Sequence, residues 1–421
     1  MTARLVPWSL FAALIASAGL PIYIHAPKFY VDEYGVTLVT LGVVLGALRL
    51  VDVVQDPALG WLAEKGRTHR GAMVGVAVAL MGLAMLGLFA VPPLLPPLWW
   101  FAVTLAVLFS AFSFLTICFY AQGVAKAATL PGGHLQLASW RESGALLGIS
   151  VAAVAPAVLG LVMGHPFTGF AIGFAGFCLV ASFAMRGEWR AAPLQSDFAQ
   201  AAPSPFAILG DVGARRLLLL ALVNAAPVAV TSTLFLFFVE SRIGAPDLAG
   251  PLLLLFFLAA AVSAPVWGRL AAVYGQKRVL MGGMVLAILA FLYALRLGTG
   301  DIVAFAVISA ASGAALAADM VLLPAIFARH MAVRGAGEAM GFGLWSFASK
   351  LTLAFAALTL FPLLDWGGFQ AGQANSAQAL QTLTLLYAGL PCALKVLAIV
   401  LLARTRLDET PLADMTRSSL T

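Results

Sequence analysis

Long apolar stretches separated by short polar segments run through the whole chain. A helix needs about 20 apolar residues to cross a bilayer, and windows of that length recur twelve times. They cover residues 7–27, 38–61, 71–92, 98–122, 139–163, 167–186, 215–239, 248–273, 278–297, 301–328, 337–362 and 381–403. The chain is 62% hydrophobic and only 10% charged, whereas soluble domains carry about 25% charged residues. We therefore predict an all-α membrane protein with 12 transmembrane helices.

One polar stretch divides these windows into two equal groups. Residues 187–214 are rich in Ala, Pro, Ser and Gln and form the longest polar interruption of the chain. We predict an N-terminal six-helix bundle over 1–186, a linker over 187–214, a C-terminal six-helix bundle over 215–403 and a tail over 404–421.

The first window allows a second interpretation. Ala16-Ser17-Ala18 resembles a signal-peptide cleavage site. The apolar run continues beyond it, however, and its removal would leave an odd number of helices. We therefore favour an intact first helix that is kinked at Gly19 and Pro21.

The basic residues are distributed unequally between the two sides of the predicted membrane protein. With the N-terminus inside, 18 of the 24 Lys and Arg residues lie in inner loops and tails, 3 lie in outer loops and 3 lie within spans. Inner loops are the ones enriched in Lys and Arg. We therefore expect both termini and the linker to be cytoplasmic and the chain to reside in the cell inner membrane. This asymmetry also accounts for the pI of about 9.4 without a nucleic-acid partner.

Three charged residues interrupt the second span. Arg49, Asp52 and Asp56 fall within about 60° of one another on a helix and share one face. A carboxylate at the centre of a membrane helix costs about 2.5–3.5 kcal/mol, and two carboxylates one turn apart repel each other. The functional interpretation is a cation or proton site facing a central cavity. The structural interpretation is an Arg49–Asp52 ion pair, with Asp56 capping a kink at Pro57.

An internal repeat separates the scaffold from this cluster. The segment 57–63, Pro-Ala-Leu-Gly-Trp-Leu-Ala, recurs 208 residues later as 265–271, Pro-Val-Trp-Gly-Arg-Leu-Ala, and basic residues follow each copy. Two halves related by a parallel repeat are the arrangement of the major facilitator superfamily. The positions equivalent to Arg49, Asp52 and Asp56 are occupied by Phe257, Ala260 and Ala264. The charged cluster is therefore not required by the repeated fold.

Two further groups of polar residues lie in the first half. Ser113, Thr116 and Tyr120 share one face of the fourth span. Their hydroxyls could complete a sodium shell or pack and bond between helices. Arg141 and Glu142 open the fifth span and could anchor it at the interface or line the cavity as a gate.

The second half carries isolated charges. Asp319 lies in the tenth span, and Lys350 lies about 13 residues into the eleventh, too deep to reach either interface easily. We expect Lys350 to pair with a carboxylate, Asp319 among the candidates, or to contact substrate. Lys395 is closer to the end of its span and is expected to extend to the membrane surface. Cys118, Cys178 and Cys392 are consistent with small buried apolar residues.

Several of these motifs together resemble one family. Arg49-x-x-Asp52-x-x-x-Asp56-Pro57-x-x-Gly60, followed by a basic loop, resembles the glycoside–pentoside–hexuronide:cation symporter family. Phe119-Tyr120 with Arg141, Ala318-Asp319 with Pro324, and Phe347-x-x-Lys350 are also similar to that family. The resemblance implies a cation site of Asp52, Gln55, Asp56 and Ser113, a substrate site of Tyr120, Arg141, Lys350 and Thr116, and structural or gating roles for Arg49, Pro57, Gly60 and Asp319. If the ion is Na⁺, Asp52 and Asp56 would be its ligands.

Two departures from the family pattern concern the substrate. Thr116 stands where the family has a sugar-binding carboxylate, and no acid lies near Ala16 or Ser17, where the family has another. Their joint absence disfavours a glycoside. A cavity with Arg141 and Lys350 but few acids favours an anionic or amphipathic solute.

These observations favour a cation-coupled secondary transporter, a symporter of a small solute driven by Na⁺ or H⁺. The alternatives are a proton-driven exporter or amphipath transporter on the same fold, and a non-transporting receptor. The sequence has no nucleophile motif, phosphate-binding loop or paired histidines at helical spacing. We therefore expect no enzyme activity, no cofactor beyond the coupling ion, and a monomer whose partners are a small-molecule substrate and membrane lipid.

Overall fold

The protein is described by a computed structural model that covers residues 5–190, 205–334, 337–370 and 373–405, and the described residues form helices joined by short connections. The first half contains α1 (Val6–Ser17), α2 (Leu20–Tyr34), α3 (Leu38–Lys65), α4 (Arg70–Phe89), α5 (Pro97–Ala127), α6 (Gly133–Leu159) and α7 (Pro166–Met185). The second half contains α8 (Pro205–Gly210), α9 (Val212–Phe237), α10 (Ala249–Tyr274), α11 (Gln276–Ala294), α12 (Ile302–Arg334), α13 (Glu338–Trp366), α14 (Ala377–Thr384) and α15 (Leu390–Arg404).

Every predicted apolar window coincides with helix in the structure. Among the described residues, ten helical segments are long and apolar enough to cross a membrane. The first window corresponds to the pair α1 and α2, which are separated at Ala18 and Gly19, so the predicted kink takes the form of a break. The second window corresponds to α3, and the last corresponds to α14, a π-helical turn at Leu385–Gly389 and α15.

Several helices extend beyond their predicted windows, among them α2 and α6. α2 continues to Tyr34 rather than ending near residue 27, because the polar residues of its second half lower the hydropathy without breaking the helix. α6 begins at Gly133, not at 139. Arg141 and Glu142 therefore lie more than two turns inside α6, and both are buried. Their interpretation as an anchor at the membrane surface is wrong.

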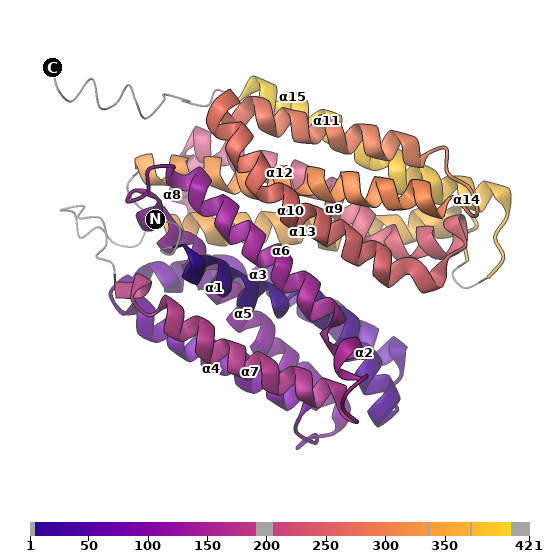
Figure 1. Ribbon diagram of the computed structural model, residues 1–421, viewed down its shortest axis with the longest axis horizontal. Helices are drawn as coiled ribbons and strands as arrows, with labels where there is room; N and C mark the ends of the chain where they lie inside the picture. Colours follow the sequence, from indigo (N-terminus) through magenta and orange to yellow (C-terminus); the bar gives the residue numbers. More distant parts are fainter. Residues whose placement is uncertain (1–4, 191–204, 335–336, 371–372, 406–421) are drawn as a thin grey trace.

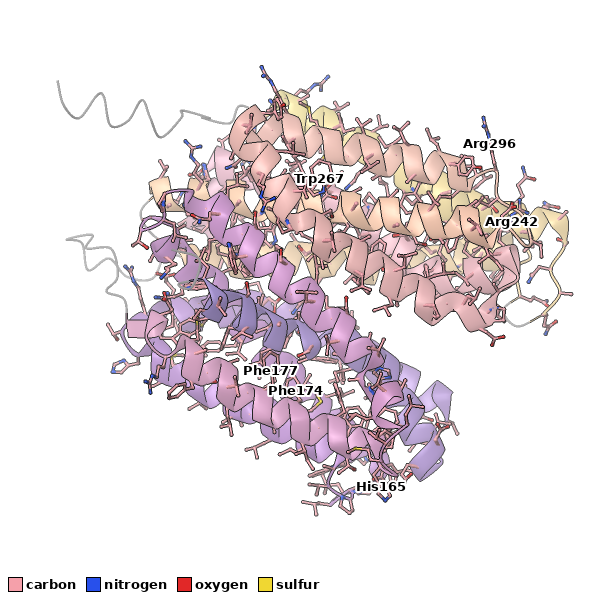
Figure 2. All side chains as sticks on the ribbon, viewed as in Figure 1. His165, Phe174, Phe177, Arg242, Trp267 and Arg296 are labelled. Carbon is pink, nitrogen blue, oxygen red and sulfur yellow. The ribbon has the colours of Figure 1, made fainter. Side chains whose placement is uncertain are left out.

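The helices form two bundles that lie side by side, α1–α7 in one and α9–α15 in the other (Figure 1). The start of α1, the end of α7, α8 and the end of α15 lie at one end of the molecule, which we call the linker end (Figure 1). His165, Arg242 and Arg296 lie at the opposite end, the far end (Figure 2). Trp267 of α10 donates its indole N–H to the carbonyl of Ala314 on α12 at 2.7 Å, one of the contacts that tie the second bundle together.

Glycines of the internal repeat bring the bundles together. α3 packs on α13 and α6 packs on α10. A Cβ at Gly60 would lie 3.0 Å from the Ala339 carbonyl oxygen, and a Cβ at Gly343 would lie 2.9 Å from the Asp56 carbonyl oxygen. A Cβ at Gly268 would lie 2.0 Å from Ser139 Oγ. The two repeat glycines, Gly60 and Gly268, thus each permit a close approach to the other bundle.

Polar contacts reinforce the linker end. Glu64 Oε2 accepts a hydrogen bond from the backbone N–H of Ala339 at 3.1 Å, which places a carboxylate at the N-terminus of α13, where negative charge is favourable. Within the second bundle, Asp211 caps α9 and contacts His330 at 3.2 Å and Arg334 at 2.7 Å. Burial raises the pKa of Asp211, but hydrogen bonds from Ala214, His330 and Arg334 outweigh it and hold the pKa below its usual value.

Candidate functional site

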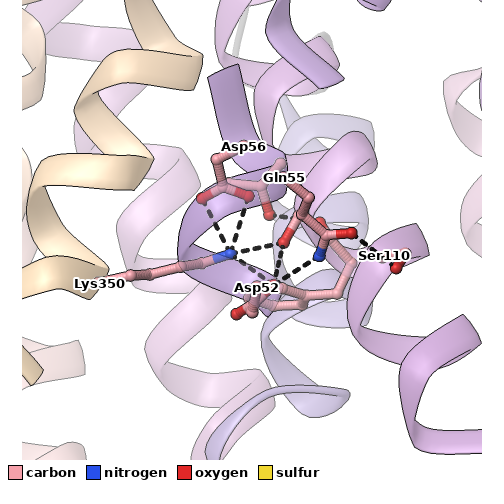
Figure 3. Close-up of polar contacts among 8 residues, drawn as sticks. Asp52, Gln55, Asp56, Ser110 and Lys350 are labelled. Carbon is pink, nitrogen blue, oxygen red and sulfur yellow. Dashed lines mark hydrogen bonds and ion pairs between the residues drawn. The ribbon is translucent and has the colours of Figure 1, made fainter. Parts of the chain in front are cut away.

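The ammonium group of Lys350 lies between the two membrane-embedded aspartates. Lys350 Nζ is 2.8 Å from Asp52 Oδ1 and 3.0 Å from Asp56 Oδ2, and it donates a hydrogen bond to Asp56 Oδ1 at 3.0 Å (Figure 3). Lys350 belongs to α13 and the aspartates belong to α3, so this ion pair crosses between the bundles. The cluster thus contains two carboxyl groups and a single amino group.

Helix periodicity brings the two carboxylates together. Asp52 and Asp56 are four residues apart and project from one face of α3 toward α13. Pro57 follows Asp56 directly and lacks the N–H that a helix would donate to the Val53 carbonyl. α3 nevertheless continues through Pro57 to Lys65. Asp56 is fully buried and Asp52 is 8% exposed.

Hydroxyl and amide groups complete the surroundings of the carboxylates. Ser113 of α5 donates to Asp52 Oδ1 at 2.9 Å and receives a hydrogen bond from Lys350 at 2.6 Å. Gln55 donates its amide N–H to Asp52 Oδ1 at 2.9 Å, and its oxygen accepts from Ser110 at 2.9 Å. The four residues expected at the cation site therefore lie together. In this arrangement the Gln55 oxygen is engaged by Ser110, so Gln55 supports Asp52 through its nitrogen.

A second cluster joins three residues of the first bundle. Tyr120 of α5 and Arg141 of α6 both donate to Glu142 Oε1, at 2.9 and 2.8 Å. The Arg141 guanidinium lies 3.7 Å from the Tyr120 ring centroid, a cation–π contact. Arg141 Nη2 is buried and has no hydrogen-bond partner among the described residues. One donor of this cluster is thus left unsatisfied by the described residues.

This second cluster also reaches the other bundle. Tyr120 packs against Phe342 of α13 with ring centroids 5.1 Å apart. Phe342 in turn packs against Phe327 of α12 at 5.3 Å. Thr116, one turn before Tyr120, donates its hydroxyl to the Phe112 carbonyl of its own helix at 2.7 Å, so its oxygen lone pairs remain available. Tyr120, Arg141 and Thr116 are near one another, while Lys350 lies with the aspartates.

A third cluster lies within the second bundle. Lys395 Nζ contacts Asp319 Oδ2 at 2.5 Å and Asn224 Oδ1 at 2.6 Å, and Lys395 is 4% exposed. The expectation that Lys395 extends to the membrane surface is wrong, because a carboxylate on α12 and an amide on α9 satisfy its charge inside the bundle. Asp319 is accordingly the partner of Lys395 and not of Lys350.

Some participants were not among the candidates predicted from the sequence. Glu142, Ser110 and Asn224 complete the three clusters, and only Glu142 had attracted notice as a membrane-embedded charge. Ser110 lies one helical turn from Ser113, a spacing that could have indicated it. The side chain of Arg49 falls outside the described residues. Among the residues that the structure describes, no group of three or more His, Cys, Asp and Glu side chains is arranged to hold a metal ion.

Comparison with known proteins identifies the family. The profile of the MFS/sugar transport protein family matches residues 9–409, and the chain belongs to that family. A bacterial homologue of the iron transporter ferroportin in an outward-facing state has a similar structure, with a TM-score of 0.72, 14% identity and coverage of 96% of this chain and 99% of that one. An asparagine-to-alanine variant of the E. coli fucose:proton symporter is similar too, with a TM-score of 0.70, 14% identity and coverage of 96% and 99%. A search of curated proteins found no match.

The two solved structures are too distant in sequence to indicate more than a shared fold. The family and fold together define a multi-pass membrane transporter rather than an enzyme.

Proposed function

We propose that the protein is a cation-coupled secondary transporter in which Asp52 and Asp56 bind Na⁺ or H⁺. The observation that carries this proposal is the position of Lys350, whose ammonium already occupies the space between the two carboxylates. A site that holds one monovalent positive charge can exchange it for another. The surrounding oxygens of Ser113 and Gln55 are of the kind that hard cations prefer.

The mechanism is a competition between the ion and Lys350. A cation or proton at Asp52 and Asp56 supplies the positive charge in place of Lys350 and weakens a charge pair that joins the bundles. Asp56 lies one turn from Gly60 on α3, and Gly60 packs directly on α13. Loss of the Lys350 contact therefore acts on the helix pair that joins the bundles. Movement of the two bundles around a central site would then carry the solute across.

The arrangement of the ion site also supports a finer family assignment. Asp52, Gln55, Asp56 and Ser113 come together as they would in a glycoside–pentoside–hexuronide:cation symporter, and we propose membership of that group. The asymmetry of Lys and Arg supports an inner membrane location with cytoplasmic termini. On this proposal the protein acts as a monomer, with the coupling ion as its only cofactor.

The substrate site is proposed to lie at Tyr120, Arg141 and Thr116. Both cations that were expected to attract an anion are already paired, Lys350 with the aspartates and Arg141 with Glu142. Charge alone therefore no longer favours an anionic solute. The free Arg141 Nη2 and the ring of Phe342 favour a small solute with a hydrogen-bond acceptor and an apolar face.

A ligand screen tests this function directly. The purified full chain in detergent would be heated with panels of sugars, organic acids and lysolipids, each in NaCl and in choline chloride at pH 7.5 and at pH 5.5. A bound ligand raises Tm. We expect at least one solute to stabilise the wild type more when Na⁺ or protons are abundant, and Asp52→Asn to lose that dependence. Equal stabilisation in Asp52→Asn would contradict cation coupling at this site.

Transport itself supplies the second readout. With the solute identified by the screen, proteoliposomes bearing wild type should accumulate it when an inward Na⁺ or H⁺ gradient is imposed. Asp52→Asn should bring the solute only to equal concentrations. Gradient-driven accumulation of the solute by Asp52→Asn would refute the proposal. Movement of the solute out of the proteoliposomes, opposite to the inward ion flow, would show that the protein is an antiporter and not a symporter.

A further inference from the structure

A pocket at the linker end is built from both bundles and lies away from the ion site. Its volume is about 780 Å³. One wall is the start of α6 with the loop before it, and the other is the last three turns of α10. Arg269 lies on the α10 wall, five residues before α10 ends at Tyr274, which is about 7–8 Å along a helix. We therefore expect the pocket to lie near the headgroup region of a bilayer that α10 spans.

The lining of this pocket presents donors and no carboxylate. Arg269 has no ion-pair or hydrogen-bond partner among the described residues. Gln136 accepts from the N–H of Gly132 through Oε1, at 3.2 Å, which leaves its amide NH₂ to donate elsewhere. The indole N–H of Trp140 has no acceptor in the part of the chain that the structure describes. A guanidinium, an amide and an indole together suit a phosphate group.

Apolar stripes continue from the pocket along both helices toward the middle of the bilayer. On α10, Val262 and Val266 precede Arg269 at helical spacing, and they are 74% and 48% exposed. On α6, Leu147 and Val151 follow Trp140 at helical spacing and are 50% and 64% exposed. The groove thus joins a polar mouth to two exposed apolar faces, which match a headgroup and acyl chains and not a water-soluble phosphate.

We propose that this groove binds an anionic membrane phospholipid, with its phosphate at Arg269 and its acyl chains between α6 and α10. The floor of the groove is the contact of Gly268 with Ser139, which exists only while the bundles touch at the linker end. A lipid bound there stabilises that closed arrangement. The preference of the lipid for the closed arrangement rests on the proposed function, in which the bundles move during transport. Lipid binding itself does not depend on that function.

Binding is tested on the purified full chain in a neutral detergent. Dioleoylphosphatidylglycerol, dioleoylphosphatidylcholine and soluble glycerol 3-phosphate would each be titrated while Tm is measured. We expect a saturable increase in Tm with phosphatidylglycerol alone. Arg269→Gln should weaken the apparent affinity about fivefold, the effect of one basic side chain near an anionic lipid surface. Arg269→Lys should retain most of the affinity.

A matched control lies at the far end. Arg296 is exposed like Arg269 but remote from the groove (Figure 2), so Arg296→Gln should bind phosphatidylglycerol as the wild type does. Equal stabilisation by phosphatidylcholine, by glycerol 3-phosphate or in Arg269→Gln would overturn the lipid site. If Arg269→Gln does not fold, Gln136→Ala should weaken the affinity by a smaller factor, and an unchanged affinity would count against the site.

The state dependence has its own measurement. Thr129 and Tyr274 are exposed at the linker end and belong to opposite bundles. Spin labels at Thr129→Cys and Tyr274→Cys should shift toward their shorter distance when phosphatidylglycerol is added, and Arg269→Gln should abolish the shift. An unchanged distance distribution despite lipid binding would overturn the stabilisation of the closed arrangement.

Discussion

Lys350 Nζ lies 2.8 Å from Asp52 Oδ1, and this contact links a helix of one bundle to a helix of the other. The same ammonium group also contacts Asp56 and Ser113. The Lys350 ammonium is therefore part of the aspartate cluster and also part of the contact between the two bundles. Loss of the Lys350 contact therefore changes the charge around Asp52 and Asp56 and the contact between the bundles in a single step.

Replacement of Lys350 tests this competition. In Lys350→Gln the carboxylates of Asp52 and Asp56 lose the ammonium group that contacts them. A cation from solution then no longer competes with that ammonium group. We expect the apparent affinity for the coupling cation, measured from the increase in Tm on titration, to rise about tenfold, which corresponds to about 1.4 kcal/mol. Lys350→Arg, which keeps the charge, should not show this gain. A loss of cation binding in Lys350→Gln would mean that Lys350 helps to bind the ion.

The glycine contacts predict a steric effect on closure of the linker end. Gly60→Val would place methyl groups against the backbone of α13. Overpacking of this kind costs about 1–3 kcal/mol, so the bundles should separate there. Spin labels at Thr68→Cys and Val333→Cys should report longer distances. Gly75→Val is the control, because nothing lies within 4 Å of a Cβ at Gly75, and a similar shift in it would argue against a specific contact.

The pair Asp319 and Lys395 predicts a stability effect that is independent of transport. Lys395→Met leaves a buried carboxylate without its cation, and loss of one partner of a buried pair costs about 3–5 kcal/mol. The midpoint of denaturant unfolding in detergent should fall accordingly. The double variant Lys395→Met with Asp319→Leu should recover most of the loss. If the single variant is as stable as wild type, the pair has no structural role.

A pH effect is expected at the cap of α9. Because the pKa of Asp211 is lowered in the folded protein, its contribution to stability is present above the ordinary aspartate pKa and is lost as pH falls through the lowered value. Asp211→Asn should therefore lower Tm at pH 7 but not at the most acidic pH at which the protein still folds. Since the side chain is 24% exposed, the effect at pH 7 should stay below about 1 kcal/mol. A constant difference across pH would exclude the ionised form as the cause.

The helices and the cluster around Asp52 and Asp56 could be predicted because both leave a local pattern. Apolar windows located the spans, and the mismatch between the two repeats singled out Asp52 and Asp56. The C-terminal end of α2 and the start of α6 could not be predicted in this way, since polar residues such as Asp32, Glu33, His134 and Gln136 lower the hydropathy of segments that nevertheless stay helical.

The charge pairs could not be predicted because their partners are distant in sequence. Asp319 and Lys395 are 76 residues apart, and Lys350 and Asp56 are 294 apart. No spacing rule connects such residues. Family resemblance assigned Lys350 to the substrate, while the folded chain brings it to the aspartates, a position that only the packing of α13 on α3 determines.

The most direct test of an ion site at Asp52 and Asp56 is the cation dependence of thermal unfolding in the wild type and in the double variant Asp52→Asn, Asp56→Asn. Tm would be measured in detergent over a range of NaCl concentrations, with choline chloride holding ionic strength constant, and over a range of pH. Na⁺ or protons should stabilise the wild type, and the double variant should lose this stabilisation. Identical cation and pH dependence in the two proteins would contradict an ion site at Asp52 and Asp56.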